Sequence, residues 1–184
     1  MRILFGKLQT DQPDLLNGDL EEAENCIPFI QSYGPFPSPV AYSSAAADTV
    51  RGAYSTKDLS GTVYTFLGTA GALYRESSTA LNGVSRTASY TTAADSPGWE
   101  IETFGNTVIA ANGSDALQFY TMGTSSQFLD MSASASAPVA RHIAVVRDFL
   151  FTGYQPTNQA RVQWSRINNP LRFGTSQRFQ SDYQ

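Results

Sequence analysis

The stretch VYTFLGTAGALYRE, residues 63–76, decides the fold expected of this 184-residue chain. A β-branched and aromatic run ends at Gly68, a short GTAG turn follows, and a second run of the same kind begins at Leu73. Such a pair of runs predicts two short strands joined by a turn. The pattern recurs in VIAANG and LQFY, where the first run ends forty-five residues later at Gly113. It recurs again in FLFTG and VQWS, where the first run ends after a further forty residues at Gly153.

Each copy of the pattern also has a leading run, and the first two copies have a trailing run. The leading runs begin at Val50, Trp99 and Arg141, and the trailing runs at Asn82 and Gln127. A unit of about 40–45 residues with four short strands is the period of a β-propeller blade. We therefore predict an all-β, β-propeller-like fold of about three four-stranded blades, which is either an incomplete propeller or the front part of a larger one. The predicted domains are an extended, proline-rich N-terminal arm (residues 1–45) and a partial propeller-like body (46–184), with repeats near 46–90, 95–135 and 138–184.

The third repeat is expected to be incomplete. After WSRINNPLRF (residues 164–173) the sequence turns polar, and TSQRFQSDYQ shows no clear fourth strand. Propellers usually contain four to eight blades, because the apolar faces of each sheet must be covered by neighbours. Three blades would leave two faces open. Either the chain is the front part of a longer protein, or copies of itself or other partners cover its ends.

Composition favours a soluble all-β protein. The chain is rich in Phe, Tyr and Gly and has only two Lys, which disfavours exposed helices. Its apolar runs are far shorter than the roughly 18 residues needed to cross a bilayer, so no membrane-spanning segment is expected. The N-terminal apolar stretch, residues 3–5, is too short for a signal peptide. Residues 131–140, MSASASAPVA, are expected to form a linker between the second and third repeats.

The sequence offers no recognisable catalytic or metal-binding motif. One cysteine, Cys26, and one histidine, His142, cannot form a structural zinc site within the chain. His142 has no nucleophile elbow or similar motif to act with. The acidic residues between Asp11 and Glu24 do not follow the spacing of an EF-hand calcium loop. We therefore expect no catalytic residue, no cofactor and no bound metal, and the protein is not expected to be an enzyme.

Charge is distributed unevenly along the chain. Residues 1–140 carry six Lys and Arg against fourteen Asp and Glu, whereas residues 141–184 carry six Arg against two Asp. Because the guanidinium group is suited to interfaces and phosphate, this basic tail is a candidate for contacts with an acidic partner or the DNA backbone. A solvated strand face is the alternative. The candidate contact residues are Arg161, Arg166, Arg172 and Arg178.

A proline-rich segment follows the acidic one. IPFIQSYGPFPSPV, residues 27–40, contains four prolines within twelve residues, interleaved with aromatic residues. Such a segment is expected to be extended, stiff and poor in backbone donors. It would suit an arm laid across a neighbouring subunit or across the first blade. The candidate inter-subunit residues are Pro28, Phe29, Tyr33, Pro35, Phe36 and Pro37.

Several blocks of this chain together resemble a family of tailed-bacteriophage and prophage virion proteins. An acidic residue precedes N-x-I-P at residues 25–28, and Y-G-P-x-P follows at 33–37. The blocks W-x-x-x-x-F-G at 99–105 and A-R-x-x-x-V-V-R-D-F at 140–149 come later, and the resemblance covers residues 11–173. Within this family, the chain is similar in kind to the tail hub or nozzle proteins of short-tailed phages, which are also called packaged-DNA stabilisation proteins.

The resemblance implies a structural role without an active site. It implies a propeller-like body after an N-terminal arm, in a virion protein that continues the portal and adaptor channel and helps to retain the packaged DNA. The implied partners are copies of the chain in a ring (hexamer or dodecamer), portal, adaptor or other tail proteins, and transiently the packaged DNA. The implied location is the phage tail or neck, after assembly in the cytoplasm of the bacterial host.

Two other functions remain as alternatives. A glycan-binding or glycan-processing propeller would need carboxylates in a central pocket, for which Glu102, Asp115, Asp130 and Asp148 are candidates. The chain lacks the S-x-D-x-G-x-T-W box of sialidase propellers. A fibre-docking or receptor-binding virion protein would instead use exposed tyrosines as contacts, and its candidates are Tyr33, Tyr42 and Tyr154.

Overall fold

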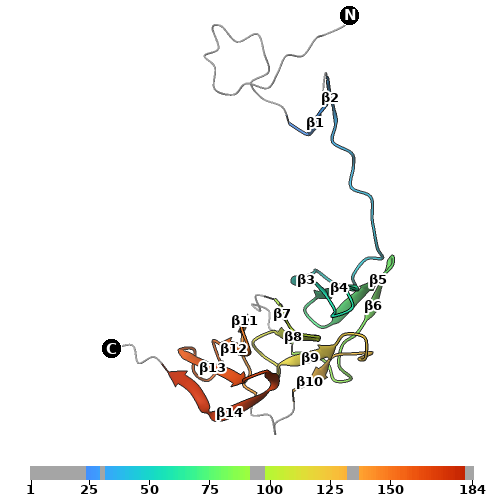
Figure 1. The fold of residues 1–184 in the computed structure, drawn as a ribbon. Helices are drawn as coiled ribbons and strands as arrows, with labels where there is room; N and C mark the ends of the chain where they lie inside the picture. Colours follow the sequence, from blue (N-terminus) through green and yellow to red (C-terminus); the bar gives the residue numbers. More distant parts are fainter. Residues whose placement is uncertain (1–23, 30–31, 92–97, 132–136, 181–184) are drawn as a thin grey trace, which may run out of the picture. The chain divides into compact units, whose positions relative to one another are not determined.

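The computed structural model describes residues 24–29, 32–91, 98–131 and 137–180 (Figure 1). The chain divides into two units, Met1–Ala41 and Tyr42–Gln184. The predicted all-β class is confirmed, because the elements in the described ranges are strands and none of them is a helix. The acidic residues before Glu24 and the linker residues 132–136 lie outside the described residues.

The described residues of the first unit form a small antiparallel hairpin. Its strands are β1 (Cys26–Phe29) and β2 (Ser32–Pro35), in which Cys26 pairs with Pro35 and Phe29 with Ser32. The Phe36 N–H then donates a hydrogen bond to the Asn25 carbonyl at 2.8 Å. Within the predicted arm, residues 26–29 and 32–35 thus form paired strands. A two-stranded ribbon tolerates its prolines because each strand has an edge where no N–H is needed.

The described residues of the second unit form three four-stranded antiparallel sheets, each with its strands in chain order. The first sheet consists of β3 (Gly52–Lys57), β4 (Val63–Gly68), β5 (Leu73–Ser77) and β6 (Ala80–Gly83). The second consists of β7 (Glu100–Phe104), β8 (Thr107–Ala111), β9 (Gln118–Thr121) and β10 (Leu129–Asp130). The third consists of β11 (His142–Val146), β12 (Phe149–Gly153), β13 (Arg161–Arg166) and β14 (Asn169–Gln180). Each copy of the sequence pattern thus forms one sheet.

The third sheet has the fourth strand that the sequence pattern did not predict. β14 pairs with β13 through a register that shifts on both sides of Ser165, so it contains irregularities rather than clean alternation. Two of its apolar residues, Leu171 and Phe173, pack into the core formed with the second sheet. Because the third sheet has four strands, the expectation of an incomplete third repeat was wrong.

Consecutive sheets pack face against face. We call the face that each sheet turns towards the next sheet in the chain its forward face, and the opposite one its backward face. One core joins the forward face of the first sheet, including Phe66 and Leu73, to the backward face of the second, including Val108 and Tyr120. A second core joins the forward face of the second sheet to the backward face of the third, and includes Ile109, Ala111, Leu117, Ile143 and Leu150. The leading strands are also neighbours, since β3 contacts β7, and β7 contacts β11.

The junctions between sheets repeat a contact between a glycine and the residue before the next leading strand. Trp99 precedes β7, and a Cβ at Gly68 would lie 2.2 Å from its Cδ1 atom. Arg141 precedes β11, and its Cβ would lie 3.3 Å from a Cβ at Gly113. Backbone hydrogen bonds accompany both contacts, from Trp99 N–H to the Arg51 carbonyl and from Gly113 N–H to the Ala140 carbonyl, each 3.1 Å. The two contacts are similar in kind, but the strand registers align Gly68 with Ala111 rather than with Gly113.

Candidate assembly surface

The forward face of the third sheet has the composition of a buried sheet face, but among the described residues of the second unit no sheet packs against it. The strand registers show which residues occupy the same position in the three sheets. In the first sheet Leu73 lies opposite Gly68. When the printed registers are continued by one residue, Leu117 lies opposite Ala111 in the second sheet and Val162 opposite Gly153 in the third. Leu73 and Leu117 are fully buried, whereas Val162 is 39% exposed. The difference lies in the neighbour, since the first two sheets each have a following sheet. The residues that make up this forward face are Ala144, Val146, Phe149, Phe151, Val162 and Trp164.

Aromatic rings form the centre of this face. The centroids of Phe149 and Phe151 are 6.4 Å apart, and those of Phe151 and Trp164 are 5.9 Å apart. Val146, at the end of β11, is 52% exposed. A contiguous apolar patch of this kind is typical of a surface that binds another protein. The alternation of apolar residues signalled the strands, but only the register shows that the patch lies uncovered.

The candidate arginines lie on the third sheet but not on one face. Residues two apart in a strand share a face. In β13, Arg161 therefore lies on the backward face with Gln163, whereas exposed Arg166 lies on the forward face with Trp164. In β14, exposed Arg172 lies between two residues that pack backward, which places it on the forward face. Arg178 pairs with Gln163 in the backbone ladder, and its side chain lies outside the described residues. The structure thus brings Arg166 and Arg172 to the border of the apolar face and separates them from Arg161.

A polar contact joins the leading strands of the second and third sheets. His142 Nδ1 lies 2.9 Å from Glu100 Oε2, and the two side chains are 60% and 40% exposed. The guanidinium of Arg141 lies 5.2 Å from the centroid of the Tyr154 ring, and the His142 ring meets the same tyrosine edge-on. Open depressions of about 330 and 360 Å³ flank the pair. Glu100 and His142 occupy equivalent register positions, opposite Ala111 and Gly153, but no sequence motif indicated that they meet.

A second polar cluster, the Arg86 cluster, ties the segment after the first sheet to the second sheet. It consists of Arg86, Tyr90, Asp115, Asp130 and the groups that bond them. The Arg86 guanidinium donates from Nη1 to Asp130 Oδ1 at 2.6 Å and from Nη2 to Asp115 Oδ1 at 2.8 Å. It also lies 4.7 Å from the Tyr90 ring centroid.

Two of the four carboxylates considered for a glycan site therefore already bind a buried arginine. The side chains of Arg86 and Asp115 are 12% and 8% exposed. Of the other two, Glu102 is half-buried in the middle of β7, and Asp148 lies in the turn after β11. The structure therefore does not gather the four carboxylates into one pocket.

Hydrogen bonds set the protonation of Asp115. Burial acts to raise the pKa of this carboxyl, but hydrogen bonds from Asn112, Thr91 and Arg86 outweigh burial and hold the pKa below the ordinary value of 3.8. Burial likewise disfavours the charge on Arg86, but Asp130 and Asp115 raise its pKa. Burial also raises the pKa of Tyr90 to about 12. The cluster is therefore ionic, with a neutral tyrosine beside it, at neutral pH.

We expect the Arg86 cluster to make the fold sensitive to acid. Because the pKa of Asp115 is lower in the folded than in the unfolded state, its contribution is present above pH about 4 and is lost as pH falls through the folded pKa. Urea denaturation at a series of pH values should show the free energy of unfolding falling below pH about 4. Asp115→Asn should be less stable at pH 7 and show a smaller fall. An equally steep fall in the variant would show that other carboxyls carry the effect.

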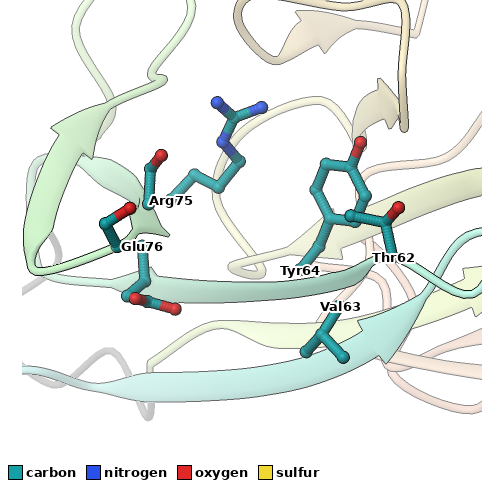
Figure 2. A pocket seen from close by; sticks show the side chains of 7 residues that line it. Thr62, Val63, Tyr64, Arg75 and Glu76 are labelled. Atoms are coloured by element: carbon teal, nitrogen blue, oxygen red, sulfur yellow. The ribbon is translucent and has the colours of Figure 1, made fainter.

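A depression on the first sheet is drawn in Figure 2 and has a volume of about 240 Å³. Tyr64 and Arg75 extend to one side of the strands, and Val63 and Glu76 to the other (Figure 2). The Arg75 guanidinium lies 5.7 Å from the Tyr64 ring centroid and donates to Tyr120 Oη at 2.7 Å. The Arg75 side chain therefore takes part in the junction with the second sheet. Glu76 lies on the opposite face of the first sheet.

The candidate arm residues all lie in the first unit, in or just after its hairpin. Phe29 and Phe36 are each 62% exposed, whereas Tyr33 is half-buried. Pro28 and Pro35 stand in β1 and β2, and Pro37 follows them in an extended segment. Of the tyrosines considered for fibre docking, Tyr42 and Tyr154 in the second unit are 73% and 37% exposed.

Comparison with known proteins adds no family to this picture. The sequence matches no protein-family model and no curated protein. In the described part of the chain, no helix is long and apolar enough to cross a membrane. Within the same residues, no three His, Cys, Asp or Glu side chains gather where they could hold a metal ion.

Proposed function

We propose that this chain is a virion structural protein of a tailed phage, with a propeller-like body that forms or docks onto the channel ring of the tail or neck. In that place it would help to retain and pass the packaged DNA. The sequence blocks that resemble tail hub and nozzle proteins support the proposal. The Arg166 and Arg172 side chains are candidate contacts for an acidic neighbour or for the DNA backbone.

One structural observation carries the proposal: consecutive sheets pack face against face twice, and the third sheet carries a further apolar face that no sheet of the described residues covers. Leading strands β3, β7 and β11 lie next to one another, as the innermost strands of propeller blades do. An apolar sheet face of this kind is suited to contact with another protein surface. The Arg86 guanidinium binds the Asp115 and Asp130 carboxylates, which ties the segment after the first sheet to the second sheet.

Labelled antibodies against the purified chain, applied to particles of the phage that encodes it, test the proposed place. Labels at the neck or tail, together with closed rings of the purified chain in negative-stain images, are the expected result. Labels along the fibres would favour a receptor-binding role instead. Purified particles without the chain would contradict a virion function.

A further inference from the structure

We propose that the junction between the second and third sheets contains a binding site for a small carboxylic acid that carries a hydroxyl or amino group close to its carboxylate. The site, called the Arg141 site below, consists of Arg141, His142, Glu100 and Tyr154 and of the open depression beside them. All four residues belong to two sheets that the structure describes. The inference goes beyond the proposed function, because a structural role in a virion requires no small ligand.

Backbone contacts place these residues at one end of two neighbouring leading strands. Glu100 begins β7 and His142 begins β11, and the two strands contact each other. The N–H of Arg141, just before β11, is shared between the carbonyls of Gly153 and Tyr154 at 3.3 and 3.2 Å. The same contact holds the Arg141 guanidinium 5.2 Å from the centroid of the Tyr154 ring. Paired strands therefore fix the site, and they position side chains more precisely than loops do.

The observation that carries the inference is a cation whose donors are not used. Arg141 is half-buried, and its Nε atom is buried without a hydrogen-bond partner among the described residues. None of the ion pairs within those residues includes it, whereas Arg86 binds two carboxylates. Because buried polar groups are nearly always hydrogen-bonded, an unpaired donor of this kind calls for a partner from outside the chain. The planar fork of a guanidinium is suited to an oxyanion.

An open depression beside the cation has room for such a partner. Its volume is about 330 Å³, and it is lined by Gly98, Trp99, Glu100, Arg141 and His142. This volume is at the lower end of the range of roughly 300–1,000 Å³ that is usual for small-molecule sites. A ligand of the size of an amino acid or a single sugar therefore fits better than a larger one.

The contact between Glu100 and His142 decides which oxyanion is preferred. His142 Nδ1 lies 2.9 Å from Glu100 Oε2. Because a carboxylate only accepts hydrogen bonds, Nδ1 carries the hydrogen, and Nε2 of the neutral ring is an acceptor like the second oxygen of Glu100. Phosphate offers further negative charge and acceptors to these groups, which is unfavourable. A carboxylate bound at Arg141 with a hydroxyl or amino group nearby would instead donate to them.

Saturation-transfer difference NMR on the purified chain tests the ligand class, because it detects weak ligands on single chains and on large rings alike. D-Glucuronate and L-alanine carry a carboxylate with a hydroxyl or amino group nearby, and they stand for a sugar acid and an amino acid as sources. At least one should bind at about pH 8 with a dissociation constant of about 0.1–1 mM. D-Glucose lacks the carboxylate and acetate lacks the donor, so both should bind at least about ten-fold more weakly.

Three substitutions locate the binding. Arg141→Met should raise the dissociation constant of the bound probe about 10- to 100-fold, because charge-assisted hydrogen bonds are lost while an unbranched side chain remains beside Tyr154. Arg147→Met is the matched control, since Arg147 is an exposed arginine just after the other end of β11, and it should leave binding unchanged. Glu100→Gln replaces one acceptor by an amide that also donates, so it should reduce the preference for the probe over acetate.

Circular dichroism should show that all three variants retain the fold. If Arg141→Met does not fold, Glu100→Gln still tests the site, because its side chain is 40% exposed. Absence of binding of both D-glucuronate and L-alanine at about 10 mM would overturn the proposal. It would also be overturned by binding that Arg141→Met leaves unchanged, or by inorganic phosphate that binds as tightly as the carboxylates. None of these results depends on where antibodies label phage particles, so the site and the virion role can fail separately.

Discussion

Replacement of Trp99 by alanine is expected to lower the free energy of unfolding by about 3–5 kcal/mol, a typical cost of deleting a buried tryptophan side chain. The indole is 7% exposed and fills the space above Gly68 and beside Gly52. Its Nε1–H donates to the Thr69 carbonyl at 2.8 Å, and its ring meets Tyr90 edge-on at 4.8 Å. The substitution would leave a cavity between the first and second sheets. Since many domains of this size are stable by only about 5–15 kcal/mol, the variant should be near the limit of folding.

Urea denaturation followed by far-ultraviolet circular dichroism measures this loss without relying on tryptophan fluorescence. Trp99→Phe is the matched control, because it retains most of the ring contacts but removes the hydrogen bond to Thr69. It should cost about 1–2 kcal/mol. A loss below about 1 kcal/mol for Trp99→Ala would show that the junction between these sheets does not depend on the indole.

Replacement of Arg86 by methionine is expected to cost about 3–5 kcal/mol, the usual cost of removing one partner of a buried ion pair. The guanidinium binds Asp115 and Asp130 and also donates to the carbonyl groups of Ala88 and Ser89. Methionine would fill much of the same volume but leave the Asp115 carboxylate buried without its cation. The loss should be seen as a lower urea midpoint at pH 7.

The double variant Arg86→Met with Asp115→Asn separates charge from packing. It removes the orphaned carboxylate, so it should be more stable than the sum of the two single losses predicts. Arg86→Lys should fall between wild type and Arg86→Met, since lysine keeps the charge but not the fork that spans both carboxylates. Strict additivity in the double variant would mean that Arg86 acts through its contacts with backbone carbonyls rather than through Asp115.

The strands of the body were largely predictable because their signals are local. β-branched and aromatic runs ending at Gly68 and Gly153 correspond to β4 and β12, and the forty-residue period corresponds to one sheet per repeat. β14 was missed because pairing with β13 and the packing of Leu171 and Phe173 stabilise a strand whose second half is mostly polar. Its register shifts also remove the clean alternation that sequence reasoning detects.

The clusters between the sheets could not be predicted because their residues are far apart in the sequence. Arg86 meets Asp130 across forty-four residues, and Glu100 meets His142 across forty-two. No spacing rule connects such pairs until the sheets are stacked. The open forward face is a similar case, since Val162 reads as an ordinary strand residue and only its alignment with Leu73 and Leu117 reveals the missing neighbour. The hairpin of residues 26–35 was missed because its prolines favour extended chain without indicating where it turns.

The most direct test is a cryo-electron microscopy reconstruction of the purified native assembly at a resolution that separates strands. We expect a closed ring of copies in which the three four-stranded sheets of residues 52–180 pack face against face, with β3, β7 and β11 side by side. Copies that stand alone, or sheets that do not pack face against face, would contradict the function proposed for this chain.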